Sequence, residues 1–476
     1  MIFHSLTFVA FFLIVVSLYW RLPHRAQNAL LLVSSYVFYG WIHPWFLLLI
    51  FASTVVDFWA GRGMATTPER KRWFLTASLI VNLGMLGFFK YYNFFAANVQ
   101  AALAAVHFHV PLPALHVILP VGISFYTFQE LSYTLEVYKG RLAPRKDFLD
   151  FATFVCFFPQ LVAGPIERAA HLLPQVEQPR TFSWPHARDA MFLILWGYFK
   201  KLVVADNTGV IANKVFALQQ PGFFMLWAGV FAFSIQIYAD FSAYSDIARG
   251  TARWLGFDLM RNFDHPYMAT GPTDFWRRWH ISLSSWFRDF VYIPLGGSRA
   301  GAFKEYRNIF LTFLLSGFWH GANWNYVLWG AYHGALLVLA RLFSPRGVRA
   351  PGAANWLTPL RIVGMLVLTN IGWLLFRETD AHYLWRELTT LPDWGNTFDR
   401  SAGRYLFFYT VLYSLPLWIN SIWEVFVSPR LALRDETGAI RSTPWIFTQA
   451  AIAGVLFAAL LVFHSQQSLD FIYFKF

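Results

Sequence analysis

The stretch from Phe318 to Trp324 places an ionisable imidazole, that of His320, at the end of an apolar run. The run itself, Ile309 to Trp319, is about half as long as the ~20 residues that a membrane-spanning helix needs. Since basic residues precede the run, we expect a half-helix that carries His320 ~20 Å into the hydrocarbon core. A histidine at that depth suits a general base, which removes a proton from a hydroxyl as the hydroxyl attacks an activated acyl carbon.

A second histidine, His280, lies in a tryptophan-rich segment between Pro272 and Pro294. Large apolar residues recur there at spacings of three and four, which predicts one helix with a broad aromatic face. These residues are Trp276, Trp279, Leu283, Trp286 and Phe290. His280 borders this face, so helix packing would bring its imidazole and that of His320 into one cavity. The alternative is an interfacial helix that lies at the lipid headgroups.

Other polar residues in apolar stretches have simpler structural interpretations. His333, inside the apolar segment that follows His320, is expected to be a hydrogen-bonded packing residue. Asp246 and Arg249 stand three positions apart, a spacing that favours an ion pair on one helix. Glu130 and Glu136 are interpreted as satisfied polar residues and not as a catalytic pair of carboxylates.

The sequence lacks the motifs of several common catalytic sites. It contains no Gly-x-Ser-x-Gly nucleophile elbow, no His-Glu-x-x-His zinc motif and no Gly-Lys-Ser/Thr phosphate loop. Its single cysteine, Cys156, rules out an intramolecular disulfide and a cysteine-based metal cluster. We therefore expect neither a metal site nor a bound cofactor, and a histidine that acts as a base is what remains.

The composition is that of an all-α, polytopic integral membrane protein. Of the 476 residues, 57% are hydrophobic and only 13% are charged, whereas a soluble domain has about 25% charged residues. The net charge of +12 is explained by basic residues in cytoplasmic loops, so we do not expect a nucleic-acid partner. The aromatic content of 20% suits belts at the lipid headgroups and the walls of an apolar cavity.

Basic residues fall at alternate boundaries between the apolar runs. By the positive-inside rule, the N-terminus is outside and the loop from Gly61 to Trp73 is cytoplasmic. The following loop, Ala96 to Pro113, has no Lys or Arg, in agreement with that orientation. The first run, Phe8 to Trp20, lacks a basic n-region and a small-residue cleavage site, so we expect it to be retained and not cleaved as a signal peptide.

Ionisable residues interrupt several later apolar stretches, among them Lys200, Lys201 and Asp240. Because such residues are costly in lipid unless they face protein, the interior is expected to be partly polar. We find no internal repeat or soluble domain and predict one membrane domain over residues 1–476. It would consist of N-terminal helices over 1–112, a motif-bearing core over 113–345 and C-terminal helices over 346–476.

Three motifs give the sequence a specific family resemblance. They are Phe275-Trp276-Arg277-Arg278-Trp279-His280-Ile281-Ser282-Leu283-Ser284, Tyr292-Ile293-Pro294-Leu295-Gly296-Gly297, and Trp319-His320-Gly321-Ala322-Asn323. With further matches along nearly the whole chain, the sequence resembles bacterial membrane-bound O-acyltransferases of the alginate O-acetyltransferase type.

The resemblance implies a ring of roughly eleven or more transmembrane helices around re-entrant half-helices, with a central funnel. It assigns the essential catalytic role to His320 and a place beside it to His280. Residues of the same motifs are then candidates for substrate binding: Trp276, Arg277, Arg278, Trp279, Trp319 and Asn323.

The resemblance also implies a cytoplasmic acyl thioester, acetyl-CoA, as co-substrate, and a location in the bacterial inner membrane. The acceptor would be an extracytoplasmic polysaccharide, acetylated directly or through a partner acetyltransferase. Peptidoglycan and teichoic acid remain alternative acceptors. A transporter or flippase, in which broken helices and buried ionisable residues mark a solute path, is the alternative class of protein.

Overall fold

The computed structural model describes residues 1–162, 164–299, 301–343, 356–428, 443–467 and 469–475. Throughout these ranges the regular elements are helices, which confirms the predicted all-α class. The chain forms two compact units. Unit 1 comprises Met1–Ile194 with Ile247–Met260, and unit 2 comprises Leu195–Asp246 with Arg261–Phe476.

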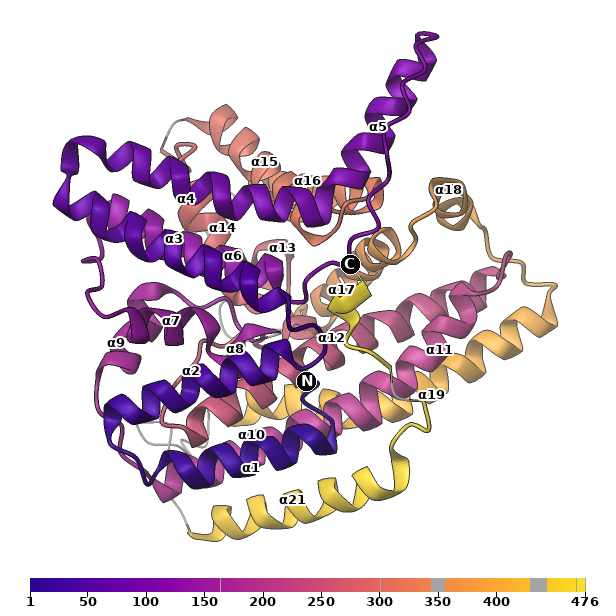
Figure 1. Ribbon diagram of the computed structural model, residues 1–476. Coiled ribbons are helices and arrows are strands. Elements are labelled where there is room, and N and C mark those ends of the chain that lie inside the picture. The colour runs from indigo at the N-terminus through magenta and orange to yellow at the C-terminus, as the bar shows by residue number, and fades with distance from the viewer. Residues whose placement is uncertain (163, 300, 344–355, 429–442, 468, 476) are drawn as a thin grey trace. The chain divides into compact units, whose positions relative to one another are not determined.

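Unit 1 is built from consecutive helices, of which α3 and α4 lie side by side and α2 packs against α7 (Figure 1). Its helices are α1 (Leu6–Tyr19), α2 (His24–Gly40), α3 (Phe46–Thr66), α4 (Lys71–Leu86), α5 (Tyr92–Ala105), α6 (Ile123–Tyr138), α7 (Phe148–Cys156), α8 (Phe158–Leu161) and α9 (Ala169–Glu177). A π-helical turn, η2 (Gly87–Tyr91), joins α4 to α5, so helix continues through the predicted loop start at Ala96. That boundary was wrong because nothing in the local sequence breaks the helix there.

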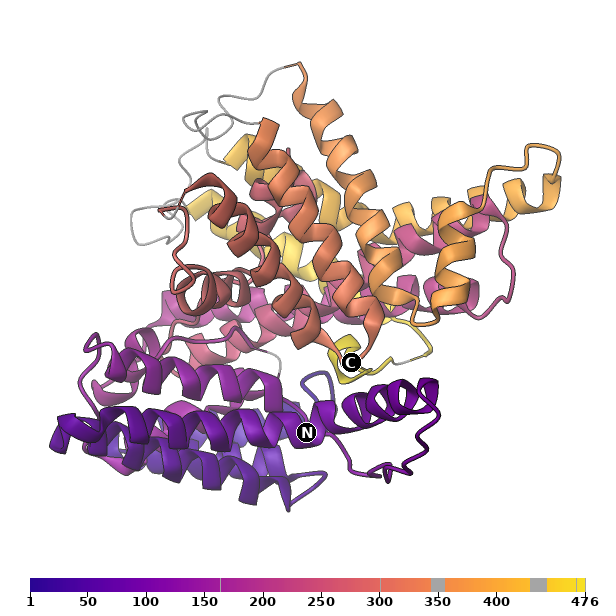
Figure 2. The same cartoon turned by 90° about the horizontal axis from the view of Figure 1, so that it is seen from above.

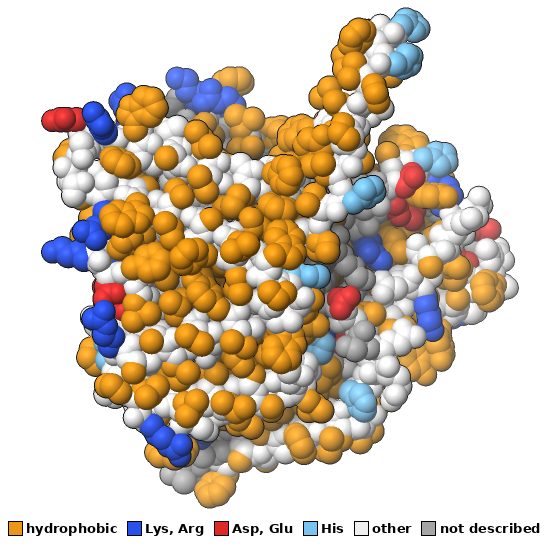
Figure 3. Space-filling model, in the orientation of Figure 1, with side chains coloured by type: hydrophobic (Ala, Val, Ile, Leu, Met, Phe, Trp, Pro, Cys, Tyr) orange, Lys and Arg blue, Asp and Glu red, His pale blue; other side chains and the backbone are white. Residues whose placement is uncertain are grey.

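The surface of unit 1 has the charge pattern of a membrane-embedded body. Figure 3 shows a broad hydrophobic face over its helices, with Lys and Arg side chains gathered at the end where the α1–α2 and α3–α4 turns lie. The exposed residues at those turns include Arg21, Arg25, Arg62, Arg70, Lys71 and Arg72. An apolar band bounded by a basic end is the expected surface of helices that cross a bilayer.

Unit 2 contains the motif-bearing segments. Its helices are η3 (Lys200–Ala205), α11 (Asp206–Phe216), α12 (Phe223–Trp254, to Asp246), η4 (Pro266–Met268), α13 (Pro272–Arg278), α14 (Ile281–Phe287), η5 (Arg288–Tyr292), α15 (Ala302–His320), α16 (Trp324–Phe343), α17 (Thr358–Arg377), α18 (Ala381–Thr389), α19 (Thr397–Ile422), η6 (Trp423–Val427), α21 (Thr443–Phe463) and η7 (Ile472–Lys475). α10 (Trp184–Phe199) passes from one unit into the other. Within unit 2, α15, α16 and α17 pack in succession (Figure 2).

Six helical stretches in the described residues are long and apolar enough to cross a membrane. They are Phe46–Thr66, Pro68–Ala105, Phe223–Trp254, Trp324–Phe343, Thr358–Arg377 and Thr397–Val427. The chain is therefore a multi-pass membrane protein, although these spans are fewer than the roughly eleven that were predicted. Several other apolar helices are shorter, such as Leu6–Tyr19 and Phe447–Phe463.

The helix that carries His320 is longer than predicted. α15 begins at Ala302 and has 19 residues, so its first two turns include the polar residues Lys304, Glu305 and Asn308. Two of these are buried and paired within unit 2: Glu305 accepts a bond from Arg341, and Asn308 donates to the carbonyls of Leu295 and Gly297. The predicted half-helix was wrong in length because hydropathy counted only the apolar part of the helix.

The predicted polar interior is present. In unit 2, Lys201 lies between Asp206 and Asp240, with Nζ–O distances of 2.8 and 3.0 Å. Asp246, expected to pair with Arg249, forms an ion pair of 2.7 Å with Lys200. In unit 1, Glu130 is fully buried and accepts bonds from Ser53 and Thr54 on α3 through Oε1, while its Oε2 has no hydrogen-bond partner among the described residues, so the predicted satisfaction of this carboxyl group is only partly confirmed.

The short helix α18 lies between α17 and α19 and carries a buried carboxyl group, Glu387. Burial raises the pKa of Glu387 to about 7, and the neighbouring Glu378 adds to this shift. A raised pKa in the folded protein means that the neutral form is favoured there. The stability that this group contributes is complete below its ordinary pKa and is lost as the pH rises through about 7.

Substitution Glu387→Gln should therefore make the stability of α18 independent of pH, because glutamine does not ionise. In the unsubstituted protein, we expect amide protection over 381–389 to fall about tenfold between pH ~5.5 and ~8, because ionisation opposes burial. The variant should keep its protection at the higher pH. Hydrogen–deuterium exchange measures this, and the exposed Asp393→Asn is the control that should retain the fall. Equal pH dependence in all three proteins would contradict the assignment.

Candidate functional site

His320 is the last residue of α15, and its side chain is enclosed by aromatic rings of unit 2. Only 3% of its surface is exposed. Its ring centroid lies 5.0 Å from those of Trp319 and Trp329, and 5.4 Å from that of Phe376. The planes of these rings meet the imidazole plane at 75–86°. Such edge-to-face packing fixes the orientation of the imidazole while it excludes water.

Glycines let the two helices that flank His320 approach closely. A Cβ at Gly321 would overlap the ring of Tyr326, and one at Gly317 would overlap the carbonyl oxygen of Tyr326 on α16. On the facing helix, a Cβ at Gly330 would lie 3.1 Å from the Cα of Gly317. Since larger residues would force α15 and α16 apart, these glycines set the position at which His320 is held.

His280 occupies a sharp turn between α13 and α14 and is fully buried. Its φ of 43° lies in the left-handed region, which costs a non-glycine residue about 1–3 kcal/mol. Backbone hydrogen bonds on both sides hold the turn: Ile281 N donates to Asn262 O, and Asp264 N donates to Arg278 O. The side chain of Asn262 accepts a bond from Ser282 and donates one to Ser245. Asn262 thus stabilises the left-handed backbone at His280 through both its main-chain oxygen and its side chain.

This turn corrects the prediction for the segment from Pro272 to Pro294. One continuous helix was expected, but the left-handed residue at His280 ends α13 and starts α14 in a new direction. The interfacial alternative is also wrong, because Trp276, Trp279 and Trp286 are buried within unit 2. The spacing of aromatic residues does not reveal that φ is positive at His280, because hydrogen bonds from a distant loop impose this backbone conformation.

The two imidazoles converge on the same aromatic neighbours. The ring centroid of Trp319 lies 5.0 Å from that of His320 and 6.3 Å from that of His280. Tyr473, in the segment that follows α21, lies 5.9 Å from His320 and 6.4 Å from His280. Phe241 of α12 completes the contacts of His280, at 4.7 Å. Residues far apart in the sequence are thereby brought into one aromatic cluster.

The other predicted site residues of the tryptophan-rich motif differ in burial and in pairing. Trp276 and Trp279 are buried behind this cluster, where Trp276 contacts Trp329 and Trp279 contacts Trp373. Arg277 is exposed, whereas Arg278 forms an ion pair with Asp274 at 2.8 Å and is held in that position. These residues therefore differ in what they can offer a substrate: apolar walls from the tryptophans and a cation from Arg277.

Asn323 and His333 have structural contacts. Asn323 lies just before α16, and its side-chain oxygen accepts a bond from Asn325 N at 3.4 Å. His333 is buried among aromatic rings, including those of Trp276 and Trp329. It is a packing residue as predicted, but its Nδ1 makes no hydrogen bond, so that part of the prediction was wrong.

Sequence reasoning missed Tyr473, Phe376, Trp329 and Phe241 as neighbours of the histidines. For Tyr473, the sequence signal was the aromatic density of the segment after His464, where Phe471, Tyr473 and Phe474 follow a short polar stretch. That signal shows an element able to pack against apolar surface, but nothing in it identifies the surface.

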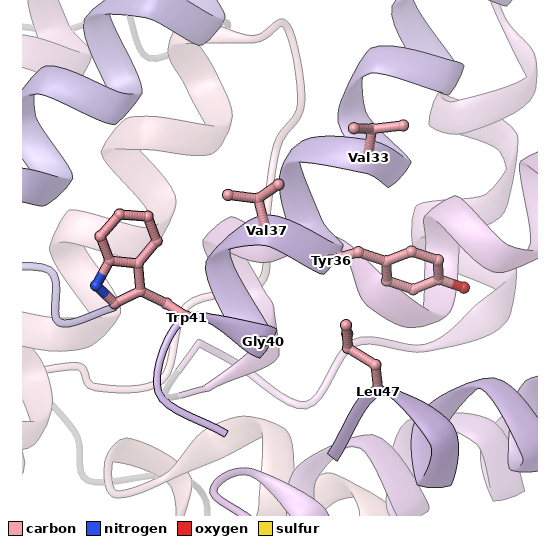
Figure 4. A pocket seen from close by; sticks show the side chains of 6 residues that line it. All are labelled: Val33, Tyr36, Val37, Gly40, Trp41 and Leu47. Atoms are coloured by element: carbon pink, nitrogen blue, oxygen red, sulfur yellow. The ribbon is translucent and has the colours of Figure 1, made fainter. Parts of the chain in front are cut away.

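A separate groove lies in unit 1 between α2 and α3 and has a volume of about 440 Å³. Figure 4 shows Val33, Tyr36, Val37 and Trp41 along it, with Leu47 of α3 pointing towards Gly40. The lining is almost wholly apolar and offers no imidazole or carboxylate. The groove therefore has no group for acid–base chemistry at neutral pH.

The histidine cluster can therefore carry out proton transfer inside an apolar enclosure. Imidazole is the side chain best suited to accept and return a proton near neutral pH. Within the described ranges, no group of three His, Cys, Asp or Glu residues is arranged to hold a metal ion. Hydrogen bonds formed in such a water-poor site are stronger than those made in solvent.

Comparison with known proteins places this geometry in context. Residues 145–371 match the membrane-bound O-acyltransferase family. The chain is 40% identical over 401 residues to a probable alginate O-acetylase of Azotobacter vinelandii, which covers 83% of this chain and 79% of that protein. It is 37% identical to a probable alginate O-acetylase of Pseudomonas putida over the whole length of both. A peptidoglycan O-acetyltransferase of Helicobacter pylori is 31% identical over all of this chain and 98% of its own length.

Substitution Gly321→Ala should destabilise the junction of α15 and α16. The added methyl group would overlap the ring of Tyr326, and we expect the free energy of unfolding to fall by about 1–3 kcal/mol. Thermal unfolding in detergent measures this change. Gly364→Ala on α17 is the matched control, since a Cβ there meets open space and should leave stability unchanged or slightly higher. A Gly321 variant as stable as this control would show that the close approach is not limiting.

Proposed function

Because this chain belongs to the membrane-bound O-acyltransferase family, we propose that it transfers an acetyl group from cytoplasmic acetyl-CoA towards an extracytoplasmic polysaccharide, with His320 as general base. The observation that carries the proposal is the convergence of His320 and His280 on Trp319 and Tyr473 in a buried aromatic cluster. The chain is an O-acyltransferase, and these imidazoles are the groups in the cluster that can move a proton at neutral pH.

The chemical step requires a base, an acyl donor and a hydroxyl. His320 takes the proton from the acceptor hydroxyl as its oxygen attacks the thioester carbonyl carbon, forming the new C–O bond. The C–S bond then breaks, and the imidazolium returns its proton to the departing thiolate. Aromatic packing on several sides of His320 supports this role, since a fixed imidazole loses little orientational freedom in the transition state.

His280 is proposed to stabilise the negative charge that develops on the carbonyl oxygen, or to orient the reacting groups. Its backbone is locked by Asn262, so its imidazole is preorganised and need not reorient during the reaction. Preorganised donors of this kind contribute much of the rate enhancement in acyl transfer. Trp319 contacts both imidazoles and is proposed to form the wall against which the acetyl group lies, with Trp276 and Trp279 supporting it from behind.

The donor is proposed to enter from the cytoplasmic side. Arg277 is exposed on α13 and is the residue of its motif best placed to meet the phosphates of coenzyme A. Arg278 is paired with Asp274, so we assign it to holding the strained turn and not to the donor. Asn323 is proposed to act by starting α16 beside His320. No bound cofactor is needed, since acetyl-CoA is consumed as a co-substrate.

The acceptor is proposed to be an exopolysaccharide outside the inner membrane of a bacterium. The names of the relatives support this choice: those at 37–40% identity are described as probable alginate O-acetylases, and the peptidoglycan O-acetyltransferase is less similar. Peptidoglycan is the second candidate, and teichoic acid the third. We further propose that an extracytoplasmic partner acetyltransferase completes transfer to the polymer, and that the N-terminus lies outside, opposite the basic end of unit 1.

A transporter or flippase is the competing class of protein. The two classes differ in bond making, so incubation of purified protein with acetyl-CoA separates them. An O-acyltransferase releases free coenzyme A and transfers acetyl groups to added polysaccharide, whereas a transporter does neither. Mass spectrometry of cell-surface polymers from a deletion strain then identifies which polymer has lost its O-acetyl groups.

Substitution His320→Ala should abolish O-acetylation while leaving the protein folded in the membrane. Loss of the base removes the group that accepts the hydroxyl proton, and transfer should fall by about 10²–10⁴-fold. Release of coenzyme A and polymer acetylation are the measurements. His333→Ala is the matched control, because it removes another buried histidine of unit 2 and leaves a cavity of similar size. Turnover retained by the His320 variant would remove this residue from the mechanism.

Substitution His280→Asn should slow transfer by about 10²-fold with little loss of stability. Asparagine tolerates the left-handed backbone that this turn requires, so the imidazole is lost while the turn is kept. Steady-state kinetics and thermal unfolding, measured on the same preparation, distinguish the two effects. If the rate falls only in proportion to the loss of folded protein, His280 has a structural role alone.

A further inference from the structure

The segment that follows α21 is tied to unit 2 at successive points along its length. Figures 1 and 2 show it returning from the end of α21 into unit 2. Asn207 donates to the carbonyl of Phe463 at 3.1 Å, and Ser465 N donates to the carbonyl of Leu202 at 3.0 Å. Further on, Lys201 Nζ donates to the carbonyl of Leu469 at 2.7 Å. These bonds fix the path of the backbone independently of its side chains.

The π-helical turn η3 makes one of these bonds possible. In η3, the amide of Asp206 bonds to the carbonyl of Lys201, five residues earlier. The wider turn leaves the carbonyl of Leu202 available to accept the bond from Ser465. The same turn presents Lys201 towards the segment. Irregular helical turns of this kind often occur at functional positions.

Asp240 accepts the last hydrogen bond from the segment and also pairs with Lys201. Its Oδ2 accepts a bond of 2.7 Å from the backbone amide of Ile472, while its Oδ1 lies 3.0 Å from Lys201 Nζ. Asp206 lies on the other side of Lys201, at 2.8 Å. All three ionic side chains are at most 2% exposed. Charge-assisted bonds from this buried triad therefore hold both Leu469 and Ile472.

Packing around the segment is shaped to receive it. A Cβ at Gly209 on α11 would lie 2.6 Å from the side chain of Leu469 and 2.7 Å from that of Gln236, so a larger residue there would force these side chains to move. The ring of Phe471 packs against Tyr244 of α12 in a tilted arrangement with centroids 4.1 Å apart, and Phe471 is fully buried. Next to these contacts, Tyr473 lies against His280 and His320.

We infer that Lys201, Asp206 and Asp240 are positioning residues for O-acyl transfer, which hold the 469–473 segment against the two histidines. The inference rests on the proposed function of His320. None of the three carboxylate or ammonium groups takes part in the acyl transfer itself. They act through the backbone of the segment, and so fix the wall that Tyr473 forms beside His280 and His320.

Three buried charges would contribute little to the stability of the fold, because apolar residues of similar volume often stabilise a fold as well or better. Buried ionic groups are more useful where one register must be favoured over its neighbours. Here the triad bonds to two main-chain groups, Leu469 O and Ile472 N, three positions apart. A shift of the segment by one residue would move Leu469 O and Ile472 N away from the ions that now bind them.

The double variant Lys201→Met/Asp240→Asn tests the inference. It removes one charge of each sign, the hydrogen bond to Leu469 O, and the carboxylate charge that strengthens the bond from Ile472 N. We expect amide exchange over 469–473 to accelerate markedly in the purified full-length protein. We also expect kcat for acetyl transfer to fall by about 10²-fold with little change in KM for acetyl-CoA, because a small displacement beside the reacting atoms is costly.

The matched control is Lys200→Met/Asp246→Asn. It removes the adjacent, partly buried ion pair, which joins the same two elements, η3 and α12, at 2.7 Å. This control should leave both exchange over 469–473 and kcat unchanged. Thermal unfolding of both double variants in detergent separates loss of the segment from loss of the fold.

If the Lys201/Asp240 variant does not fold, Gly209→Val displaces Leu469 without removing any charge and should give the same two effects.

The outcomes separate this inference from the proposed function. If His320→Ala is inactive but the Lys201/Asp240 variant releases the segment with kcat unchanged, the positioning role is wrong and the function stands. If kcat falls while exchange over 469–473 stays slow, the triad acts in some other way and the inference is equally overturned. If His320→Ala is active, the proposed function itself fails.

Discussion

Polar groups enclosed in an apolar interior must find partners, and this constraint organises the protein. Within the membrane an unsatisfied ion or main-chain group costs several kcal/mol, so each buried charge requires a matched position on another helix. Lys201, between Asp206 and Asp240, shows how this requirement joins separate elements of unit 2. Glu130 with Ser53 and Thr54 does the same in unit 1. These pairings specify which helices meet and in which register.

The histidine cluster depends on the same kind of pairing. His280 adopts a backbone conformation that its own residue type disfavours, and the hydrogen bonds of Asn262 offset that cost. His320 is placed by the close contact of α15 and α16 at glycines, which leaves its imidazole facing aromatic rings. One histidine is thus positioned by polar contacts and the other by van der Waals packing. Both arrangements limit motion at the point where the proposed mechanism moves a proton.

The proposed function requires a water-soluble thioester donor and a hydroxyl to meet at one point from which water is kept away. Enclosure by aromatic rings meets the second requirement, since the rings exclude water without offering competing nucleophiles. The distribution of cations fits the first requirement, because Arg277 remains exposed whereas Arg278 is held by Asp274. The aromatic content of the chain serves this enclosure as well as the lipid boundary.

The sequence by itself determined the all-helical membrane class, the partly polar interior and the family to which the chain belongs. Hydropathy and residue type depend on local composition, and the family motifs lie in short contiguous stretches, so both can be read from the chain. The break at His280 and the full length of α15 could not be predicted, because Asn262 and Arg341 act from distant positions. The approach of Tyr473 to both histidines was likewise decided only by the tertiary structure. Its position depends on main-chain bonds to Lys201 and Asp240, and no local pattern encodes which buried ions will receive a given backbone segment.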